Sequence, residues 1–222
     1  MRRVLILDTE TTGLDPATET CIEVGCILYD VEHAAPVASF ASLVRAESNA
    51  AENINRIPVG VLQTAPLASE VWPAVLAMAS TCGAILAHNA PFDRGFVPAE
   101  LRDSLPWICT KDDLAWPSAS RPGLSLVALA LDHGLGVSAA HRALTDCDLI
   151  ARLLNHVGDY TDLAAFLAYG LRPKATYQAL VSFDDRELAK AAGFGWDGPN
   201  KRWTRTMAIE DAAKLPFKTR TL

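Results

Sequence analysis

Residues 4–14 read VLILDTETTGL, and the fold is deduced outward from this stretch. Its four leading apolar residues predict a short buried strand, because a brief apolar run is typical of a strand inside a sheet. Asp8 and Glu10 follow directly. Side chains two residues apart on a strand point to the same face, so both carboxylates can converge on one site. Taken alone, the pair is also compatible with plain solvation at a strand end.

Two further segments place carboxylates near the ends of predicted elements. Residues 84–93 read AILAHNAPFD, a buried strand followed by Asp93 in the first helical turn, where proline and an acidic side chain are both favoured. Residues 141–146 read HRALTD, with His141 in a loop five residues before Asp146, which opens the next predicted helix. Each segment alone is weak evidence, since a lone histidine is more often structural.

Together the three segments predict a metal site. Four carboxylates in one pocket repel one another and raise each other's pKa unless cations neutralise them. A ligand set made only of oxygen favours Mg²⁺ or Mn²⁺ over zinc. Two such ions about 4 Å apart stabilise the attacking and leaving oxygens of a phosphodiester hydrolysis. His141 can act as the general base, because imidazole titrates near neutral pH. The predicted cofactors are therefore two Mg²⁺ or Mn²⁺ ions.

In this order and at these intervals, the segments resemble the Exo I, II and III motifs of the DEDDh, or DnaQ-like, 3′–5′ exonuclease superfamily. The residue after His141 is arginine where the sister subclass has tyrosine, so the resemblance is to the histidine branch. It implies that Asp8, Glu10 and Asp146 bind metal directly and that Asp93 completes the metal shell. It also implies that His141 is the catalytic base.

The resemblance extends over roughly residues 1–157. Residues 8–14, 107–110 and 141–148 look most like the exodeoxyribonuclease X group, which prefers DNA. The implied fold is α/β of the ribonuclease H-like type, with a mixed five-stranded sheet flanked by helices. The implied reaction is 3′-to-5′ hydrolysis of DNA that releases nucleoside monophosphates. An exoribonuclease of the same fold and a non-catalytic nucleic-acid-binding or polymerase accessory subunit are the alternatives.

Hydrophobic periodicity predicts the remaining elements of this first domain. The predicted strands are residues 4–8, 22–29, 37–44 and 84–87, the first three antiparallel. The predicted helices are residues 70–80, a helix from 91 toward 102, and residues 125–133 and 143–157. Strands mixed with helices in this order indicate an α/β layer.

Four residues close to the predicted metal site are candidate substrate contacts. Thr11 and Thr12 can offer hydroxyl or backbone contacts to the terminal nucleotide, and Leu14 can pack against its base. A plain strand-to-loop turn explains these three residues equally well. Asn89 either orients the loop before Asp93 or caps the following helix, and asparagine is a favoured cap residue.

Composition sets the class of protein. The 222 residues suffice for one full-sized domain and a small appendage, and the 50% apolar content supports a core without disulfides. The five cysteines are odd in number and lack the spacing of a zinc site or a disulfide framework. The sequence contains neither a signal-peptide core nor eighteen consecutive apolar residues, so we expect a cytoplasmic protein.

The balance of charge changes near residue 170. Residues 1–171 carry 10 Lys and Arg against 20 Asp and Glu, whereas residues 172–222 carry 10 against 6. We therefore expect an exonuclease domain over residues 1–170 and a small basic α+β module over residues 171–222. Charge asymmetry of this kind is typical of proteins that bind nucleic acid, although a solvated basic tail has the same composition.

The predicted module contains a strand at residues 175–183 and a helix at residues 184–192, capped by its first residue. A turn-rich cluster follows and predicts a hairpin whose arms carry Trp196 and Trp203.

Basic residues beside these tryptophans predict contacts to nucleic acid. Lys201, Arg202 and Arg205 can attract phosphates, and aromatic rings can stack on bases. One alternative is that the tryptophans form the small core of the module. Another is that the module binds a second copy of the chain or a replication or repair protein.

Overall fold

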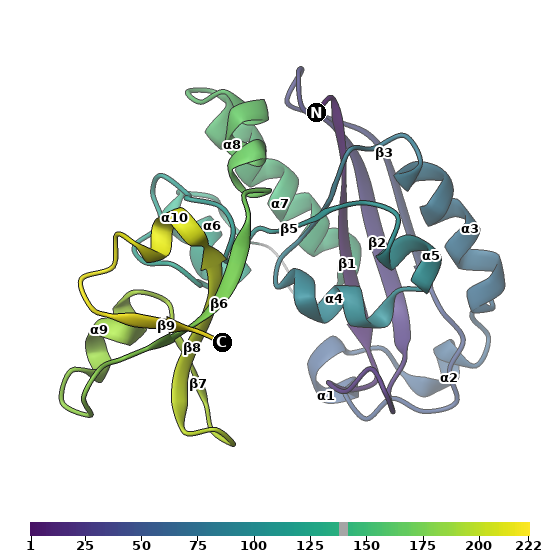
Figure 1. Cartoon of the computed structure of the whole chain (residues 1–222). Coiled ribbons are helices and arrows are strands. Elements are labelled where there is room, and N and C mark those ends of the chain that lie inside the picture. Colours follow the sequence, from purple (N-terminus) through teal and green to yellow (C-terminus); the bar gives the residue numbers. More distant parts are fainter. Residues whose placement is uncertain (138–141) are drawn as a thin grey trace.

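The structure is a computed structural model and describes residues 1–137 and 142–222. Its first sheet has the strand order β3-β2-β1-β4-β5 (Figure 1). The strands are β1 (Arg3–Thr11), β2 (Cys21–Asp30), β3 (Ala35–Leu43), β4 (Ile85–Ala87) and β5 (Trp107–Cys109). The first three are antiparallel, and β4 and β5 run parallel to β1. The predicted mixed five-stranded sheet is confirmed.

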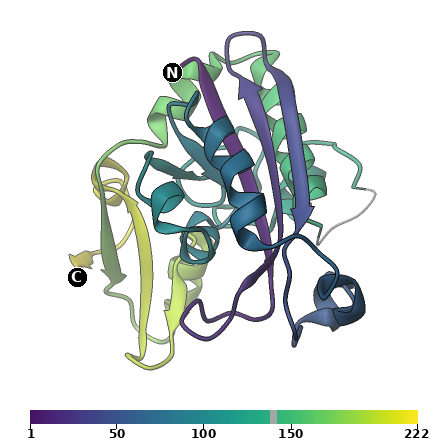
Figure 2. The same cartoon turned by 90° about the vertical axis from the view of Figure 1, so that its right-hand side faces the viewer.

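The described residues of the first domain also form eight helices. They are α1 (Glu52–Asn55), α2 (Val59–Leu62), α3 (Ala68–Ala79), α4 (Ala90–Phe96), α5 (Ala99–Arg102), α6 (Leu126–Asp132), α7 (Ala143–Gly158) and α8 (Leu163–Tyr169). Figure 2 shows α3 on one side of the strands and α7 on the other. No helix in the described part of the chain is long and apolar enough to cross a membrane.

The strand β1 is buried on both faces. Its side chains alternate in direction, so neighbouring residues pack into different apolar clusters. Val4 and Ile6 belong to the apolar cluster that α7 covers, whereas Leu5 and Leu7 belong to the cluster under α3. Asp8 and Glu10 continue the register of Val4 and Ile6. The sheet therefore directs both carboxylates to the α7 side.

The helix α7 approaches the sheet closely at Gly25. A Cβ atom at this position would lie 2.3 Å from the Leu144 nitrogen and 2.4 Å from the Ala143 carbonyl carbon. Gly25 is the partner of Asp8 in the ladder between β1 and β2. The missing side chain therefore lets the first turn of α7 lie next to Asp8.

Gly25→Ala should lower the melting temperature by several degrees and displace the start of α7. Overpacking of this kind costs about 1–3 kcal/mol, and each kcal/mol is worth roughly 2–4 °C in a protein of this size. Thermal denaturation followed by circular dichroism measures the effect. Gly60→Ala is the matched control, since a Cβ there meets nothing within 4 Å. Equal melting temperatures for Gly25→Ala and the wild type would contradict the close approach.

The helix predicted from residue 91 toward 102 is divided in the structure. Pro98 separates α4 from α5, and Val97 adopts an extended conformation with φ −93° and ψ 156°. A residue that precedes proline is disfavoured in the helical region, because the proline ring crowds its backbone. The prediction of one continuous helix was wrong for this reason.

The C-terminal module forms a second, antiparallel sheet with the order β7-β8-β6-β9. Its elements are β6 (Lys174–Ala179), α9 (Arg186–Ala191), β7 (Gly195–Asp197), β8 (Arg202–Ala208), α10 (Ile209–Ala212) and β9 (Thr219–Thr221). The predicted hairpin is present as β7 and β8. Trp196 and Trp203 face each other on its arms with ring centroids 5.3 Å apart. Trp196 is 54% exposed, while Trp203 packs against the core of the module, so the core interpretation holds for Trp203 alone.

Two boundaries in the module differ from the prediction. The strand β6 ends at Ala179 rather than at residue 183, because its partner β9 begins opposite it at Thr219. The helix α9 begins at Arg186, and Asp184 does not cap it. The cap position belongs to Asp185, whose side chain binds Ser182 instead of a helix amide.

Candidate active site

Three carboxylates meet where β1 ends and α7 begins. One oxygen atom from each of Asp8, Glu10 and Asp146 lies within 4.8 Å of the other two. Asp8 and Glu10 reach this point from β1, and Asp146 reaches it from the first turn of α7. The structure thus brings together the three residues that the sequence predicts as direct metal ligands.

Asp93 stands beside this group on α4 and is only 2% exposed. Its Oδ1 atom accepts hydrogen bonds from the Thr9 backbone nitrogen at 3.0 Å and from Thr9 Oγ1 at 2.9 Å. Thr9 lies between Asp8 and Glu10, so β1 itself fixes the fourth carboxylate. Within the described residues, Asp93 is not part of the group whose oxygen atoms lie within 4.8 Å.

Burial and mutual repulsion raise the pKa of these carboxyl groups. For Asp8, burial and then the charges of Asp93 and Asp146 raise the pKa well above its usual 3.8. For Glu10, burial and then Asp146 raise the pKa from 4.5 to about 7. Burial also raises the pKa of Asp93 from 3.8 to about 7, against the opposing hydrogen bonds from Thr9. A divalent cation would relieve this repulsion, and the all-oxygen donor set fits such an ion.

The raised pKa values predict that metal-free protein loses stability as the pH rises through about 7, where Glu10 and Asp93 ionise. The folded state binds these protons more tightly than the unfolded chain does. The stability that they contribute is therefore fully present below the unfolded-state pKa values near 4 and is lost as the pH rises through about 7. Glu10→Gln removes one of the repelling charges. It should therefore raise the melting temperature of chelated protein at pH 8. The rise should be limited to a few degrees, because water screens part of the repulsion.

The measurement is thermal denaturation in chelator at pH 5 and pH 8, with the exposed Glu100→Gln as the matched control. At pH 5 the difference between Glu10→Gln and the wild type should shrink, since Glu10 is then protonated. A melting temperature for Glu10→Gln that is lower than the wild type at pH 8 would contradict the electrostatic account.

An ion pair that the sequence analysis missed holds the start of α7. The Arg142 guanidinium donates to the Glu23 carboxylate, with Nη2 2.7 Å from Oε1. The Ala143 nitrogen donates to Glu23 Oε2 at 3.2 Å. Glu23 is 4% exposed and lies opposite Glu10 in the sheet. The available signal was a single glutamate inside the otherwise apolar segment 22–29.

The predicted substrate contacts after β1 have different environments. Thr11 Oγ1 donates to the Gly13 carbonyl at 2.6 Å, and Thr12 Oγ1 donates to Glu19. These two hydroxyls therefore brace their own loop. Leu14 is 83% exposed and is free to contact a ligand. His141, the predicted base, lies outside the described residues.

Asn89 occupies the position before α4 with φ 77° and ψ 46°, and its side chain makes no cap hydrogen bond. The cap interpretation is therefore wrong, because a capping residue has extended backbone angles and Asn89 is left-handed. His88 lies between Thr110 Oγ1 and the Leu124 carbonyl, both at 3.0 Å. Burial lowers the pKa of His88 to about 4, which fits a structural role.

Known proteins are similar to this chain in sequence. The sequence matches an exonuclease family over residues 5–154, and residues 175–222 match a domain family of unknown function. DNA polymerase III subunit epsilon of Treponema pallidum (strain Nichols) is 34% identical over 163 residues, which cover 66% of this chain and 72% of that protein.

Solved structures give the same picture. Exonuclease X in complex with 5′ overhanging duplex DNA is 28% identical and superposes with a TM-score of 0.57, covering 75% of this chain and 99% of that one. The nuclease domain of 3′hExo, a DEDDh family member bound to rAMP, shares the fold at 18% identity and a TM-score of 0.60, covering 72% and 94% of the two chains. The chain belongs to the exonuclease family of the DEDDh, or DnaQ-like, type.

Proposed function

We propose that the protein is a 3′-to-5′ exonuclease that hydrolyses the phosphodiester bonds of DNA and releases nucleoside monophosphates. The observation that carries this proposal is the meeting of the Asp8, Glu10 and Asp146 carboxylates within 4.8 Å. Three half-buried carboxylates at the end of a sheet repel one another unless cations neutralise them, which is typical of a functional site.

Asp8, Glu10 and Asp146 would hold two Mg²⁺ or Mn²⁺ ions, with Asp93 completing the donor set. Bound in this way, such ions supply Lewis-acid stabilisation and lower the pKa of water. Thr9 keeps Asp93 in place through its two hydrogen bonds. The Glu23–Arg142 pair fixes the first turn of α7 and thereby the position of Asp146. His141 is proposed as the base that accepts the proton of the attacking water.

The exposed Leu14 side chain, the backbone of the adjacent Thr11 and Thr12, and Asn89 are proposed to contact the terminal nucleotide. Similarity to Exonuclease X bound to duplex DNA and to a DNA polymerase subunit supports DNA as the substrate. The same relatives support a role in DNA replication or repair. Intact carboxylates argue against a purely accessory subunit.

The test uses matched DNA and RNA oligonucleotides of one sequence, labelled at either the 5′ or the 3′ end. We expect 5′-labelled DNA to shorten stepwise, 3′-labelled DNA to release labelled mononucleotide at once, and RNA to react more slowly. Only a contact to the 2′-hydroxyl distinguishes the two substrates, because their phosphates are alike. Faster degradation of RNA would establish the exoribonuclease alternative, and internal cuts would contradict exonuclease action.

A further inference from the structure

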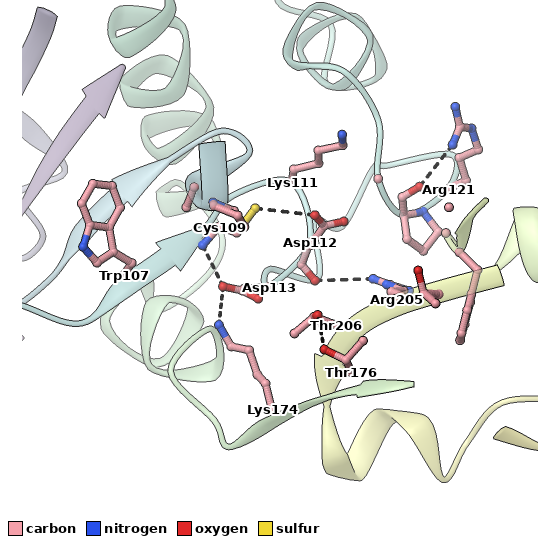
Figure 3. A pocket seen from close by; sticks show the side chains of 18 of the residues that line it. Trp107, Cys109, Lys111, Asp112, Asp113, Arg121, Lys174, Thr176, Arg205 and Thr206 are labelled. Atoms are coloured by element: carbon pink, nitrogen blue, oxygen red, sulfur yellow. Dashed lines mark hydrogen bonds and ion pairs between the residues drawn. The ribbon is translucent and has the colours of Figure 1, made fainter. Parts of the chain in front are cut away.

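A large cleft lies between the first domain and the C-terminal sheet. Its volume is about 1420 Å³, which exceeds the roughly 300–1,000 Å³ of a small-molecule pocket. One wall consists of α4, β5 and the segment 111–123, and the other of β6, α9 and β8 (Figure 3). A cleft of this size is suited to an extended ligand.

The cleft is basic although the chain as a whole carries a net charge of −6. Seven of its lining residues are lysine or arginine, and three are aspartate or glutamate. The first domain contributes Arg94, Arg102, Lys111 and Arg121. The module contributes Lys174, Lys190 and Arg205. Because both walls present cations, the cleft is complementary to a polyanion.

Two of the three acidic residues are already neutralised. Asp113 pairs with Lys174 and also accepts a hydrogen bond from the Cys109 nitrogen at 2.7 Å. Glu187 pairs with Lys190 at 2.7 Å. These carboxylates therefore oppose an incoming anion only weakly.

Lys111 and Arg121 carry the charge that remains available. Neither side chain forms a salt bridge with any residue of 1–137 or 142–222, and the one hydrogen bond of the Arg121 guanidinium goes to the Pro122 carbonyl at 3.3 Å. Both belong to the segment 111–123, opposite the module (Figure 3). They are the two cations best placed to meet phosphates.

Two contacts join the walls of the cleft. The Lys174–Asp113 pair joins β6 to the first domain. Arg205 on β8 donates to the Ala192 carbonyl at 2.6 Å and to the Asp112 carbonyl at 3.4 Å. Arg205 thereby links the module to the first domain as well as lining the cleft.

The helix α4 connects the cleft with the carboxylate site. Arg94 and Gly95 line the cleft, whereas Asp93, the preceding residue, is bound to β1. A Cβ atom at Gly95 would lie 3.1 Å from Pro16, in the loop that follows β1. The cleft therefore begins within one helical turn of Asp93, the carboxylate that α4 holds against β1.

We propose that this cleft holds the part of a single nucleic-acid strand that lies upstream of the cleaved 3′ end, with Lys111 and Arg121 as phosphate contacts. The proposal rests on the proposed exonuclease function and gives the C-terminal module a task in it. It also revises the contacts predicted from composition. Arg205 lines the cleft, but Lys201 and Arg202 do not, and Arg202 is engaged by Asp197 at 3.1 Å.

The test measures the binding of a 5′-fluorescein-labelled oligothymidylate of about twenty nucleotides by fluorescence anisotropy, at NaCl concentrations between about 50 and 200 mM. The parent protein is full-length Asp8→Asn, which should bind without degrading the strand. Lys111→Glu/Arg121→Glu in this parent should bind at least tenfold more weakly. Its salt slope should be shallower by about 1.4, because each phosphate contact to a single strand contributes about 0.7. Lys111→Gln/Arg121→Gln should lose an intermediate amount of affinity. This neutral pair keeps the test informative if the charge-reversed pair does not fold.

Lys201→Glu/Lys218→Glu is the matched control, since it changes the charge equally on exposed residues that lie outside the cleft and form no salt bridge within residues 1–137 and 142–222. It should bind within about twofold of the parent. Equal losses in both pairs would reduce the effect to overall charge and overturn the proposal. If Lys111→Glu/Arg121→Glu bound the oligonucleotide as tightly as the parent, the proposal would be overturned too. An acidic protein segment would then be the candidate occupant of the cleft. Failure of the exonuclease function is distinguishable, because wild-type protein would then leave the 3′ end of the same strand intact.

Discussion

Asp8→Asn should lower the rate of nucleotide release by at least about 10³-fold while the protein stays folded. Asp8 is one of the three carboxylates that meet within 4.8 Å, and burial and the neighbouring carboxylates raise its pKa well above 3.8. Divalent ions contribute several kcal/mol to a phosphodiester transition state, and each ~1.4 kcal/mol corresponds to a tenfold change in rate. The substitution keeps the shape of the side chain and removes one charge, so the fold should be retained or slightly stabilised.

The measurement is a single-turnover assay on 5′-labelled DNA with excess enzyme and Mg²⁺. Asp148→Asn is the matched control, because Asp148 is exposed on the same helix as Asp146 and lies outside the carboxylate group. Its rate should equal the wild-type rate. A rate for Asp8→Asn within tenfold of the wild type would show that Asp8 is not part of the reaction centre.

His141→Ala should lower the rate by roughly 10²–10⁴-fold, the usual contribution of a positioned proton transfer. The expectation comes from the position of His141 five residues before Asp146 and from the family to which the chain belongs. Metal binding should survive, since the carboxylates are untouched. The increase in melting temperature on adding Mg²⁺ should therefore be the same in His141→Ala and in the wild type.

His33→Ala is the control for loss of an imidazole, because His33 binds Asp30 at the turn between β2 and β3, away from the carboxylates. It should keep the wild-type rate. If His141→Ala instead abolished the stabilisation by Mg²⁺, His141 would be a metal ligand or a scaffold residue. If its rate matched the wild type, another group would be the base.

Four strands of the central sheet could be predicted from local patterns, whereas its five-stranded mixed topology was implied by the family resemblance. Buried runs such as residues 4–7 and 84–87 are read directly from the sequence, and the carboxylates that follow them mark the functional edge. The strand β5 has only three residues and no alternation, so its pattern is too short to separate from a loop. The break in the helix at Pro98 could have been predicted, because helices tend to end before a proline.

Contacts between distant segments could not be read from the sequence. The role of Gly25 depends on α7 lying against β2, 118 or more residues later in the chain. The Glu23–Arg142 pair depends on the same packing. The basic cleft arises only when the module lies beside the segment 111–123, and so composition pointed to the hairpin residues Lys201 and Arg202 and gave no signal for Lys111 and Arg121.

We expect a metal-dependent mechanism in which Asp8, Glu10 and Asp146 hold the divalent cations that help to cut nucleotides from a 3′ end. It is tested by following 5′-labelled DNA after complete chelation and then on adding Mg²⁺ or Mn²⁺. This mechanism predicts an intact strand in chelator and stepwise shortening after metal is added. It also predicts no shortening with Asp8→Asn, Glu10→Gln or Asp146→Asn under the same conditions. Shortening that continues in chelator, or that persists at the wild-type rate in Asp146→Asn, would contradict it.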